Sequence, residues 1–353
     1  MKHRRFIAFT AGLTCIAFLG ACSPPKSRVV TSNPQYVDKK ALKKKGDFTL
    51  PKNAGSEKAQ KQIVLYMKIS TTRSGPVALT PGAEQSLNNF IEAQVPRLKR
   101  FKVYGVYNTG ARRLVEEMAD QGRMAASESG ELPAADALLN ISIDIQTETN
   151  VFAGAKDPTD GKPKDTVVVY KVDTKASLQD STGRVLTSQN FVGIGSRDVV
   201  EIRKPDGSRQ FVGGFDPNDP GNVNTVLQSA ARKVLTDIAA MLGETYPVTG
   251  RVTGMSASGG RMSMDKGVEQ GLTNETQVVV WADDDDGVAT ALAYANCEAL
   301  DGRSTLNIWG WNTSSPDASP IIAKIQKDPA SVKSMKMYAT SIGLPVPEQW
   351  KEP

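Results

Sequence analysis

The chain contains very little of the residue type on which most enzymes rely for proton transfer. Among its 353 residues there is a single histidine, His3, and it lies in a segment that we expect to be removed. General acid–base chemistry near neutral pH most often uses imidazole, and serine or cysteine nucleophiles usually need it as a base. The remaining chain therefore cannot hold a Ser-His-Asp triad, a Cys-His dyad or a histidine-ligated zinc. A non-enzymatic protein is predicted, although chemistry by carboxylates alone stays open.

Cysteine is equally scarce. Cys15 lies in the same removable segment and Cys22 follows it directly, which leaves Cys297 without an intramolecular partner. An internal disulfide is thus excluded, and the stability of the fold has to come from packing. Small apolar residues surround Cys297 in the sequence, so burial is predicted rather than a reactive thiol.

The amino terminus has the pattern of an export signal. Lys2, Arg4 and Arg5 precede an apolar run of about 14 residues, Phe6–Leu19. A membrane-spanning helix needs about 20 apolar residues, so this run is too short to span a bilayer and is typical of a signal peptide. We expect residues 1–21 to be removed.

The end of this signal, Leu19-Gly20-Ala21-Cys22, resembles a bacterial lipobox. The resemblance implies that Cys22 becomes the first residue of the mature chain and carries a covalent diacylglycerol and an N-acyl lipid such as palmitate. Because Ser23 rather than an aspartate follows, the resemblance also implies sorting to the outer membrane, at its periplasmic face. No other cofactor and no metal are expected.

Net charge gives little reason to expect a polyanionic partner. Loss of residues 1–21 takes away three basic residues and no acidic one, so the formal charge falls from +5 to +2. A nucleic-acid-binding domain is usually strongly basic. Nucleic acid is therefore not an expected partner, whereas the membrane is one.

Composition divides the mature chain into three parts. Residues 22–61 are rich in proline and lysine and poor in large apolar residues, which predicts a flexible tether whose lysines, Lys39–Lys45, could touch anionic head groups. Residues 62–246 read as an α/β domain. Residues 247–353 read as a small β-rich domain with a C-terminal helix. The predicted fold class is α+β, with a mixed, mostly antiparallel sheet and amphipathic helices.

Hydrophobic periodicity predicts the individual elements. Strands are expected at 62–69, 101–106, 134–145, 167–178 and 184–194, the last three antiparallel, and helices at 83–98, 109–124 and 224–242, with Gly243 ending the last helix. In the second part, short strands are expected at 248–254, 260–267 and 276–281, and the final helix is expected to run from Asp328 to about Ile342.

The order of several weak motifs resembles the curli-transport (CsgG-like) lipoprotein superfamily over about residues 62–242. The motifs are a Leu87/Phe90 helix face, Arg100–Val103, Glu116–Gly122, Ala134–Ala137 and Leu178–Leu186. Family members form rings that span the outer membrane through two long hairpins per subunit. The resemblance places these hairpins at about residues 146–172 and 186–215 and implies a possible homo-oligomeric ring.

The composition of the first hairpin disagrees with membrane insertion. Residues 155–165 contain two prolines and six charges, and a charge on the lipid face costs about 2 to 4 kcal/mol at the bilayer centre. We therefore expect a scaffold or accessory protein of envelope assembly or secretion that meets other envelope proteins. A secretion-channel subunit is the alternative, and a carboxylate-based envelope hydrolase is the second alternative.

Other candidate sites are weak. Asp283–Asp286 and Asp216–Gly221 lack the ligand spacing of a calcium-binding EF-hand loop, and Gly193/Gly195 supply half of a dinucleotide fingerprint. The pairs Glu116/Glu117 and Asp136/Asp144 could act as acid and base only if the fold brought them to a cleft.

Overall fold

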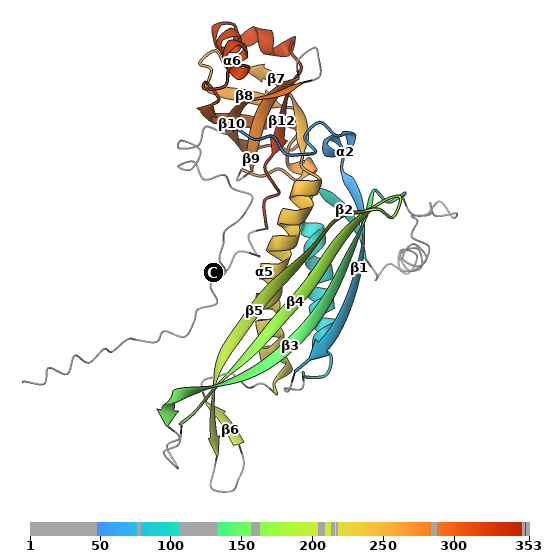
Figure 1. Cartoon of the computed structure of the whole chain (residues 1–353), viewed down its shortest axis with the longest axis vertical. Coiled ribbons are helices and arrows are strands. Elements are labelled where there is room, and N and C mark those ends of the chain that lie inside the picture. The colour runs from blue at the N-terminus through green and yellow to red at the C-terminus, as the bar shows by residue number, and fades with distance from the viewer. Residues whose placement is uncertain are drawn as a thin grey trace, which may run out of the picture.

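The computed structural model describes residues 48–75, 79–105, 133–156, 163–203, 209–212, 216, 218–274, 276–283, 288–347 and 350, with the backbone alone for 149–156, 163–168, 196–203 and 209–212. The described chain is an α+β protein. It is elongated, with a long sheet at one end and a barrel at the other (Figure 1). The predicted signal peptide, Cys22 and the predicted helix 109–124 lie outside the described residues.

The first domain is built on a six-stranded mixed sheet in the order β2-β1-β3-β4-β5-β6. β1 pairs in parallel with β2 and β3. β3, β4, β5 and β6 pair antiparallel, which confirms the pairing expected for the three long strands. The strands are β1 Ile63–Ser74, β2 Phe101–Tyr104, β3 Ala137–Lys156, β4 Pro163–Asp180, β5 Val185–Arg203 and β6 Arg209–Val212.

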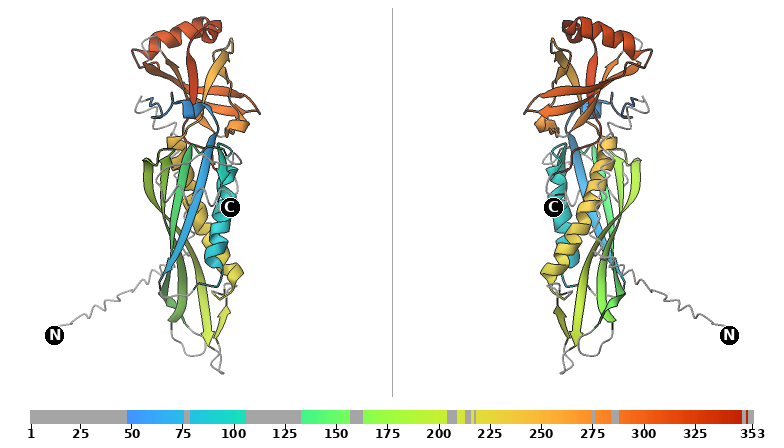
Figure 2. Two further views of the ribbon diagram at one scale, coloured as in Figure 1. Left: turned by 90° about the vertical axis from the view of Figure 1, so that its right-hand side faces the viewer. Right: turned by 90° about the vertical axis from the view of Figure 1, so that its left-hand side faces the viewer.

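Two helices cover one face of this sheet. α3, Ala83–Gln94, continues into a 3₁₀ turn at Val95–Arg97, and α5 spans Pro220–Thr245. The helices pack against each other and against the strands (Figure 2). Every residue of the predicted apolar face of α5 is buried: Val226, Leu227, Ala230, Val234, Ile238 and Met241.

Strict alternation divides the sheet into an inner and an outer face. In β4, Val172, Thr174 and Ala176 are buried under α5, while Lys171, Asp173 and Lys175 point to the other side. Successive strand residues point to opposite faces, so this pattern follows from the sequence. The three long strands, β3, β4 and β5, together form a ribbon, and its far end extends beyond the helices (Figure 1).

The second domain is a closed six-stranded barrel in the order β10-β11-β8-β7-β12-β9. Its interior is filled by apolar side chains, among them Val280, Leu292 and Leu306. Its strands are β7 Thr249–Met255, β8 Arg261–Met264, β9 Gln277–Asp283, β10 Ala289–Ala299, β11 Ser304–Trp311 and β12 Met337–Ser341, and a helix, α6 Ala318–Lys327, packs on it.

Two predicted helices differ in the structure. α5 was predicted at 224–242 but begins at Pro220 and continues past Gly243 to Thr245. Gly243 serves close packing and does not end the helix: a Cβ there would lie 2.6 Å from the backbone nitrogen of Leu344. The final helix predicted from Asp328 is instead a 3₁₀ turn, Pro329–Lys333, followed by β12. β12 pairs with β7 and β9 and thereby helps to close the barrel.

The described end of the predicted tether is not a free spacer. Residues 48–61 run along the barrel and the domain junction and include a short helix, α2, Glu57–Gln60. Ala54 and Ala59 are buried. We call residues 48–61 the N-terminal strap. The prediction that the flexible tether extends to residue 61 is wrong for this part, because its apolar residues pack on the barrel and its backbone carbonyls accept hydrogen bonds from Arg100.

Candidate functional site

The most elaborate polar site of the described chain is the junction between the two domains, where Arg100 is buried. Its Nε donates to the carbonyl oxygen of Tyr246 at 3.1 Å, and its Nη2 donates to the carbonyls of Lys58 at 2.7 Å and Pro247 at 3.1 Å. Its Nη1 donates to the carbonyl of Lys61. One side chain thus joins the N-terminal strap, the edge of the sheet and the start of the barrel.

Two helix ends make this environment suitable for a cation. The carbonyls of Lys61, Tyr246 and Pro247 belong to residues that follow the C-termini of α2 and α5, where the helix dipole is negative, and the carbonyl of Lys58 lies within the single turn of α2. Burial nevertheless lowers the pKa of Arg100 to about 10, while the charge of Asp136 acts in the opposite direction. The guanidinium is a structural clamp here, since its donors are occupied by the backbone.

The strap also binds the outer surface of the barrel. Phe48 stacks on Tyr294 of β10, with ring centroids 4.6 Å apart, and Tyr294 stacks on Trp309 of β11 at 5.4 Å. The backbone nitrogen of Thr49 donates to the hydroxyl of Tyr294 at 3.2 Å. Leu50 and Ile342 pack against the same small cluster. We call Phe48, Leu50, Tyr294, Trp309 and Ile342 the aromatic patch.

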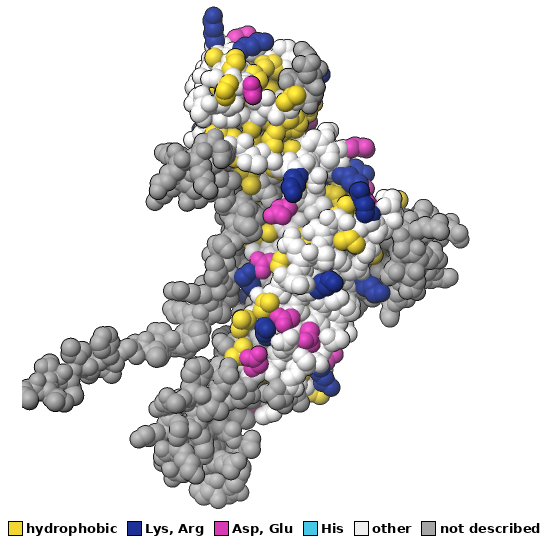
Figure 3. Space-filling model, in the orientation of Figure 1, with side chains coloured by type: hydrophobic (Ala, Val, Ile, Leu, Met, Phe, Trp, Pro, Cys, Tyr) yellow, Lys and Arg dark blue, Asp and Glu magenta, His cyan; other side chains and the backbone are white. Residues whose placement is uncertain are grey.

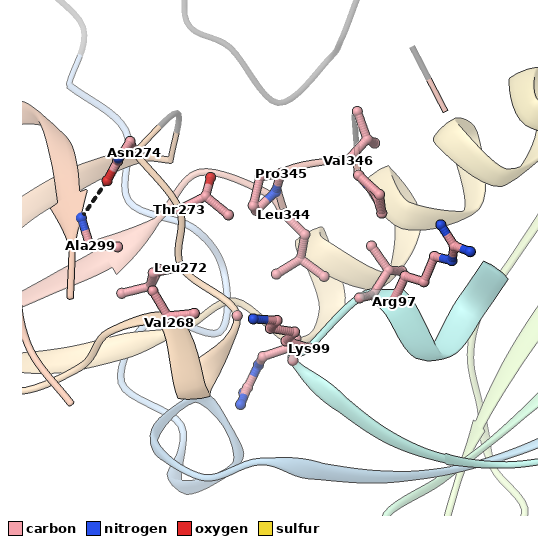
Figure 4. A pocket seen from close by; sticks show the side chains of 14 residues that line it. Arg97, Lys99, Val268, Leu272, Thr273, Asn274, Ala299, Leu344, Pro345 and Val346 are labelled. Atoms are coloured by element: carbon pink, nitrogen blue, oxygen red, sulfur yellow. Dashed lines mark hydrogen bonds between the residues drawn. The ribbon is translucent and has the colours of Figure 1, made fainter. Parts of the chain in front are cut away.

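A pocket of about 270 Å³ lies between the two domains. Val268 and Leu272 line it from the barrel, and Leu344 lines it from the segment after β12 (Figure 4). The side chain of Arg97 points away from it. Asn274 uses its Oδ1 to accept from the backbone nitrogen of Ala299 at 2.8 Å. The lining is mainly apolar and brings no acid–base pair together.

The ribbon presents a polar face and an open edge. On β5, Val192 and Ile194 are 43% and 54% exposed on the side away from α5. β5 pairs with β4 from Val185 to Val200, but with β6 only from Val200 to Arg203 among the described residues. The preceding part of β5 therefore has a free edge in the described chain, a surface to which another strand can add.

The structure separates the carboxylates that the sequence offered as an acid–base pair. Asp136 accepts from the backbone nitrogen of Val64 at 3.0 Å and lies 3.0 Å from Lys61 Nζ. Asp144 accepts from Ser74 Oγ at 3.0 Å, further along the sheet. The two residues hold different partners and line no common pocket. Glu116 and Glu117 lie outside the described residues.

Cys297 is buried, as predicted, at 2% exposure. Burial raises the pKa of its thiol to about 12. The thiol is therefore protonated at neutral pH and behaves as a small apolar group of the barrel core. Cys22, the predicted lipidation site, lies outside the described residues.

The three remaining motifs have structural explanations or are described only in part. Gly193 and Gly195 lie in β5 under α5, not in a phosphate-binding loop. Asp219 is the N-cap of α5, accepting from the backbone nitrogens of Gly221 and Asn222. Asp283 ends β9, and Asp284–Asp286 lie outside the described residues. Within the described ranges, no group of three histidine, cysteine, aspartate or glutamate residues could hold a metal ion.

None of the helices in the described part of the chain is both long enough and apolar enough to cross a membrane.

Comparison with known proteins adds no assignment. No family model matches the chain, and no curated protein matches its sequence. The α+β class is therefore supported by the structure alone, and the family and the function are proposed below.

Sequence reasoning missed Arg100 and the aromatic patch. The partners of Arg100 are backbone carbonyls 39 to 147 positions away in the chain, and no pattern of side chains in the sequence indicates them. The patch left a weak signal, since Trp309 lies on a strand whose neighbouring positions are also apolar. Phe48 is the one aromatic residue close to the end of a lysine-rich segment.

Proposed function

We propose that this protein is a bacterial lipoprotein of the outer membrane, held at the periplasmic face by acyl chains on Cys22, and that it acts as a non-enzymatic scaffold or accessory in envelope assembly or secretion. Its first domain is a CsgG-like domain in this proposal. The mechanism is placement: the lipid fixes the protein to the membrane, and the ribbon meets partner proteins.

The order of elements is the observation that carries this proposal. β1, α3 and β2 come first, and three long antiparallel strands and the long helix α5 follow. This is the order in which the motifs resembling the CsgG-like superfamily occur in the sequence. A scaffold is also consistent with the mainly apolar interdomain pocket and with carboxylates that hold separate partners.

The free edge of β5 gives the scaffold a physical means of binding. Backbone groups of an edge strand pair with an added strand, and the exposed side chains Val192 and Ile194 supply apolar contacts next to it. The outer face beside them is polar and charged, as in the pairs Lys171–Asp173 and Ser74–Asp144. Polar surroundings suit a partner that binds reversibly from water.

A test of the anchor compares Cys22→Ala with Cys15→Ala, which changes a cysteine inside the signal peptide. Cells are labelled with radioactive palmitate and fractionated. Two results together support the proposal: wild type and Cys15→Ala both carry palmitate, and the Cys22→Ala protein is unlabelled, folded and released from membranes. Palmitate absent from wild type, or membrane retention of Cys22→Ala equal to that of wild type, contradicts the anchor.

A channel subunit is the second candidate, and strand length favours it. β3, β4 and β5 have 20, 18 and 19 residues, whereas a strand needs about 9 to 11 residues to cross a bilayer. The charges of residues 155–165 count against it. Conductance in planar bilayers and heat-sensitive rings on gels would favour the channel, and a crosslinking pull-down that recovers envelope proteins without conductance would favour the scaffold.

A further inference from the structure

We propose that the aromatic patch on the barrel lies against the bilayer that holds the acyl chains of Cys22, so that the barrel end of the molecule faces the membrane and the ribbon projects away from it. This inference rests on the proposed lipid anchor and adds the orientation of the protein on the membrane.

The composition of the patch suits a lipid surface. Trp and Tyr are enriched where a protein meets the boundary between lipid head groups and acyl chains, because their rings are apolar and each has one polar atom. Here Phe48 and Trp309 lie on either side of the buried ring of Tyr294, and both are only partly buried. Figure 3 shows hydrophobic side chains gathered on the barrel where β9 and β10 lie.

The patch includes the described residue that comes first in the sequence after the proposed anchor. Phe48 is the first described residue, and 25 residues, Ser23 to Asp47, separate it from the acylated position at Cys22. A flexible chain of that length has a root-mean-square reach of about 28 Å. Five lysines, which anionic head groups attract, lie between Lys39 and Lys45, a few residues before Phe48.

The other end of the molecule is too far from the attachment point to be the favoured membrane contact. α5 has 26 residues, which corresponds to a length of about 39 Å. It runs from the barrel towards the ribbon, and the strands continue beyond it (Figure 1). The ribbon end is thus separated from Phe48 by more than the root-mean-square length of a flexible chain of this size, whereas Phe48 itself belongs to the patch.

The test uses the mature protein with Cys22→Ala, so that no acyl chain contributes to binding. Vesicles of phosphatidylethanolamine and phosphatidylglycerol are sedimented with the protein, and a parallel set carries brominated acyl chains, which quench tryptophan near the acyl region. Trp281 and Trp350 are buried, at 5% and 2% exposure, so quenching reports mainly on Trp309 and Trp311. We expect quenching by brominated vesicles and its reduction in Trp309→Phe.

Substitutions identify the face that binds. Trp309→Ser and Phe48→Ser should each lower the vesicle partition coefficient about tenfold, which corresponds to the loss of one half-buried aromatic contact. Ile194→Ser, which removes an apolar side chain 54% exposed on the ribbon, is the matched control and should leave partitioning unchanged. Circular dichroism confirms that each variant is folded. The quenching experiment is done on the protein with an unsubstituted aromatic patch, so it remains a test even if one of these variants does not fold.

Each other outcome contradicts the proposal. Absence of quenching means that the patch does not meet the bilayer. Loss of binding in Ile194→Ser alone means that the ribbon end faces it. An altered native mass of Trp309→Ser with unchanged partitioning means that a second copy covers the patch. Because these proteins carry no lipid, the results are independent of the palmitate experiment, and failure of the anchor and failure of the orientation can be told apart.

Discussion

Gly193 of β5 lies directly against Ala230 of α5: a Cβ atom on this glycine would overlap the carbonyl oxygen of Ala230. Gly195 has the same relationship to Val226, whose carbonyl oxygen would lie 2.6 Å from an added Cβ. Residues two apart on a strand and four apart on a helix are both separated by about 6 to 7 Å, so the two contacts occur in register. The glycines let the long helix rest on the backbone of the ribbon.

We therefore expect Gly193→Val to destabilise the first domain by about 1 to 3 kcal/mol, because the added atoms must push α5 away from the sheet. Urea denaturation followed by circular dichroism measures the change. Gly254→Val is the control, since an added Cβ at Gly254 of β7 meets no atom within 4 Å. Equal loss of stability in the two variants would mean that the cost comes from replacing glycine in a strand and not from the contact with Ala230.

The start of α5 depends on one carboxylate. Asp219 Oδ1 accepts from the backbone nitrogen of Gly221 at 2.7 Å and from that of Asn222 at 3.3 Å. We expect Asp219→Ala to cost about 1 kcal/mol of folding stability, because two helix-end donors lose their acceptor. Asp219→Asn retains an acceptor and should recover most of the loss in the same urea titration. If Asn is as damaging as Ala, the charge of Asp219 matters and its hydrogen bonds do not.

These contacts show what the sequence could and could not predict. The apolar face of α5 follows from helical periodicity alone, and all its predicted members are buried. β5 was expected to end at Ile194 because residues 195–221 are dense in glycine, proline and charge, yet it continues to Arg203. Gly193, Gly195 and Gly243 allow close packing against backbone atoms of other elements. A single sequence does not show which elements come that close.

The same limit applies to the junction and the barrel. Apolar residues near Met337 fit either a short helix or a strand, and the pairing of β12 with β7 and β9 decides between them. The N-terminal strap was predicted as part of a flexible tether because it has few large apolar residues. Its order comes from the barrel surface and from Arg100, partners that lie far away in the sequence.

The buried thiol of Cys297 makes stability depend on pH. Its pKa is 9.0 in an exposed state and about 12 in the folded protein, because burial disfavours the thiolate. Between these values the unfolded chain loses a proton that the folded chain keeps. The contribution to stability is therefore complete below pH 9 and declines as the pH rises towards 12, by at most about 1.4 kcal/mol for each pH unit.

Urea titrations of the wild type and Cys297→Ala between pH 8 and 11 measure this effect, and the stability of the wild type should fall more steeply. In a protein without residues 1–21 and with Cys22 replaced by Ala, a thiol reagent at pH 8 should label Cys297 only after unfolding. Parallel pH curves, or labelling of the folded protein at the rate of the unfolded one, would show that the thiol is accessible to water.

Arg100 gives the sharpest prediction for the coupling of the two domains. Replacing it by Met removes the donors to the carbonyls of Lys58, Lys61, Tyr246 and Pro247, which lie in a buried or half-buried site. We expect a loss of about 3 kcal/mol, since a buried acceptor without a donor costs about 1 to 3 kcal/mol and some of these carbonyls will regain hydration. Arg100→Lys should lie between Met and wild type, because an ammonium has three donors and lacks the planar fork.

Limited proteolysis separates this clamp from a general loss of stability. Trypsin cuts after lysine, and the strap contains Lys52, Lys58 and Lys61. If Arg100 holds the strap to the junction, Arg100→Met is cut at these positions well below its melting temperature, while Arg97→Met, which changes an exposed arginine of the preceding turn, resists like the wild type. Equal resistance of both variants would mean that Phe48 and the buried alanines of the strap are enough to hold it. Early cleavage would mean that one buried guanidinium connects the N-terminal strap with the sheet and the barrel.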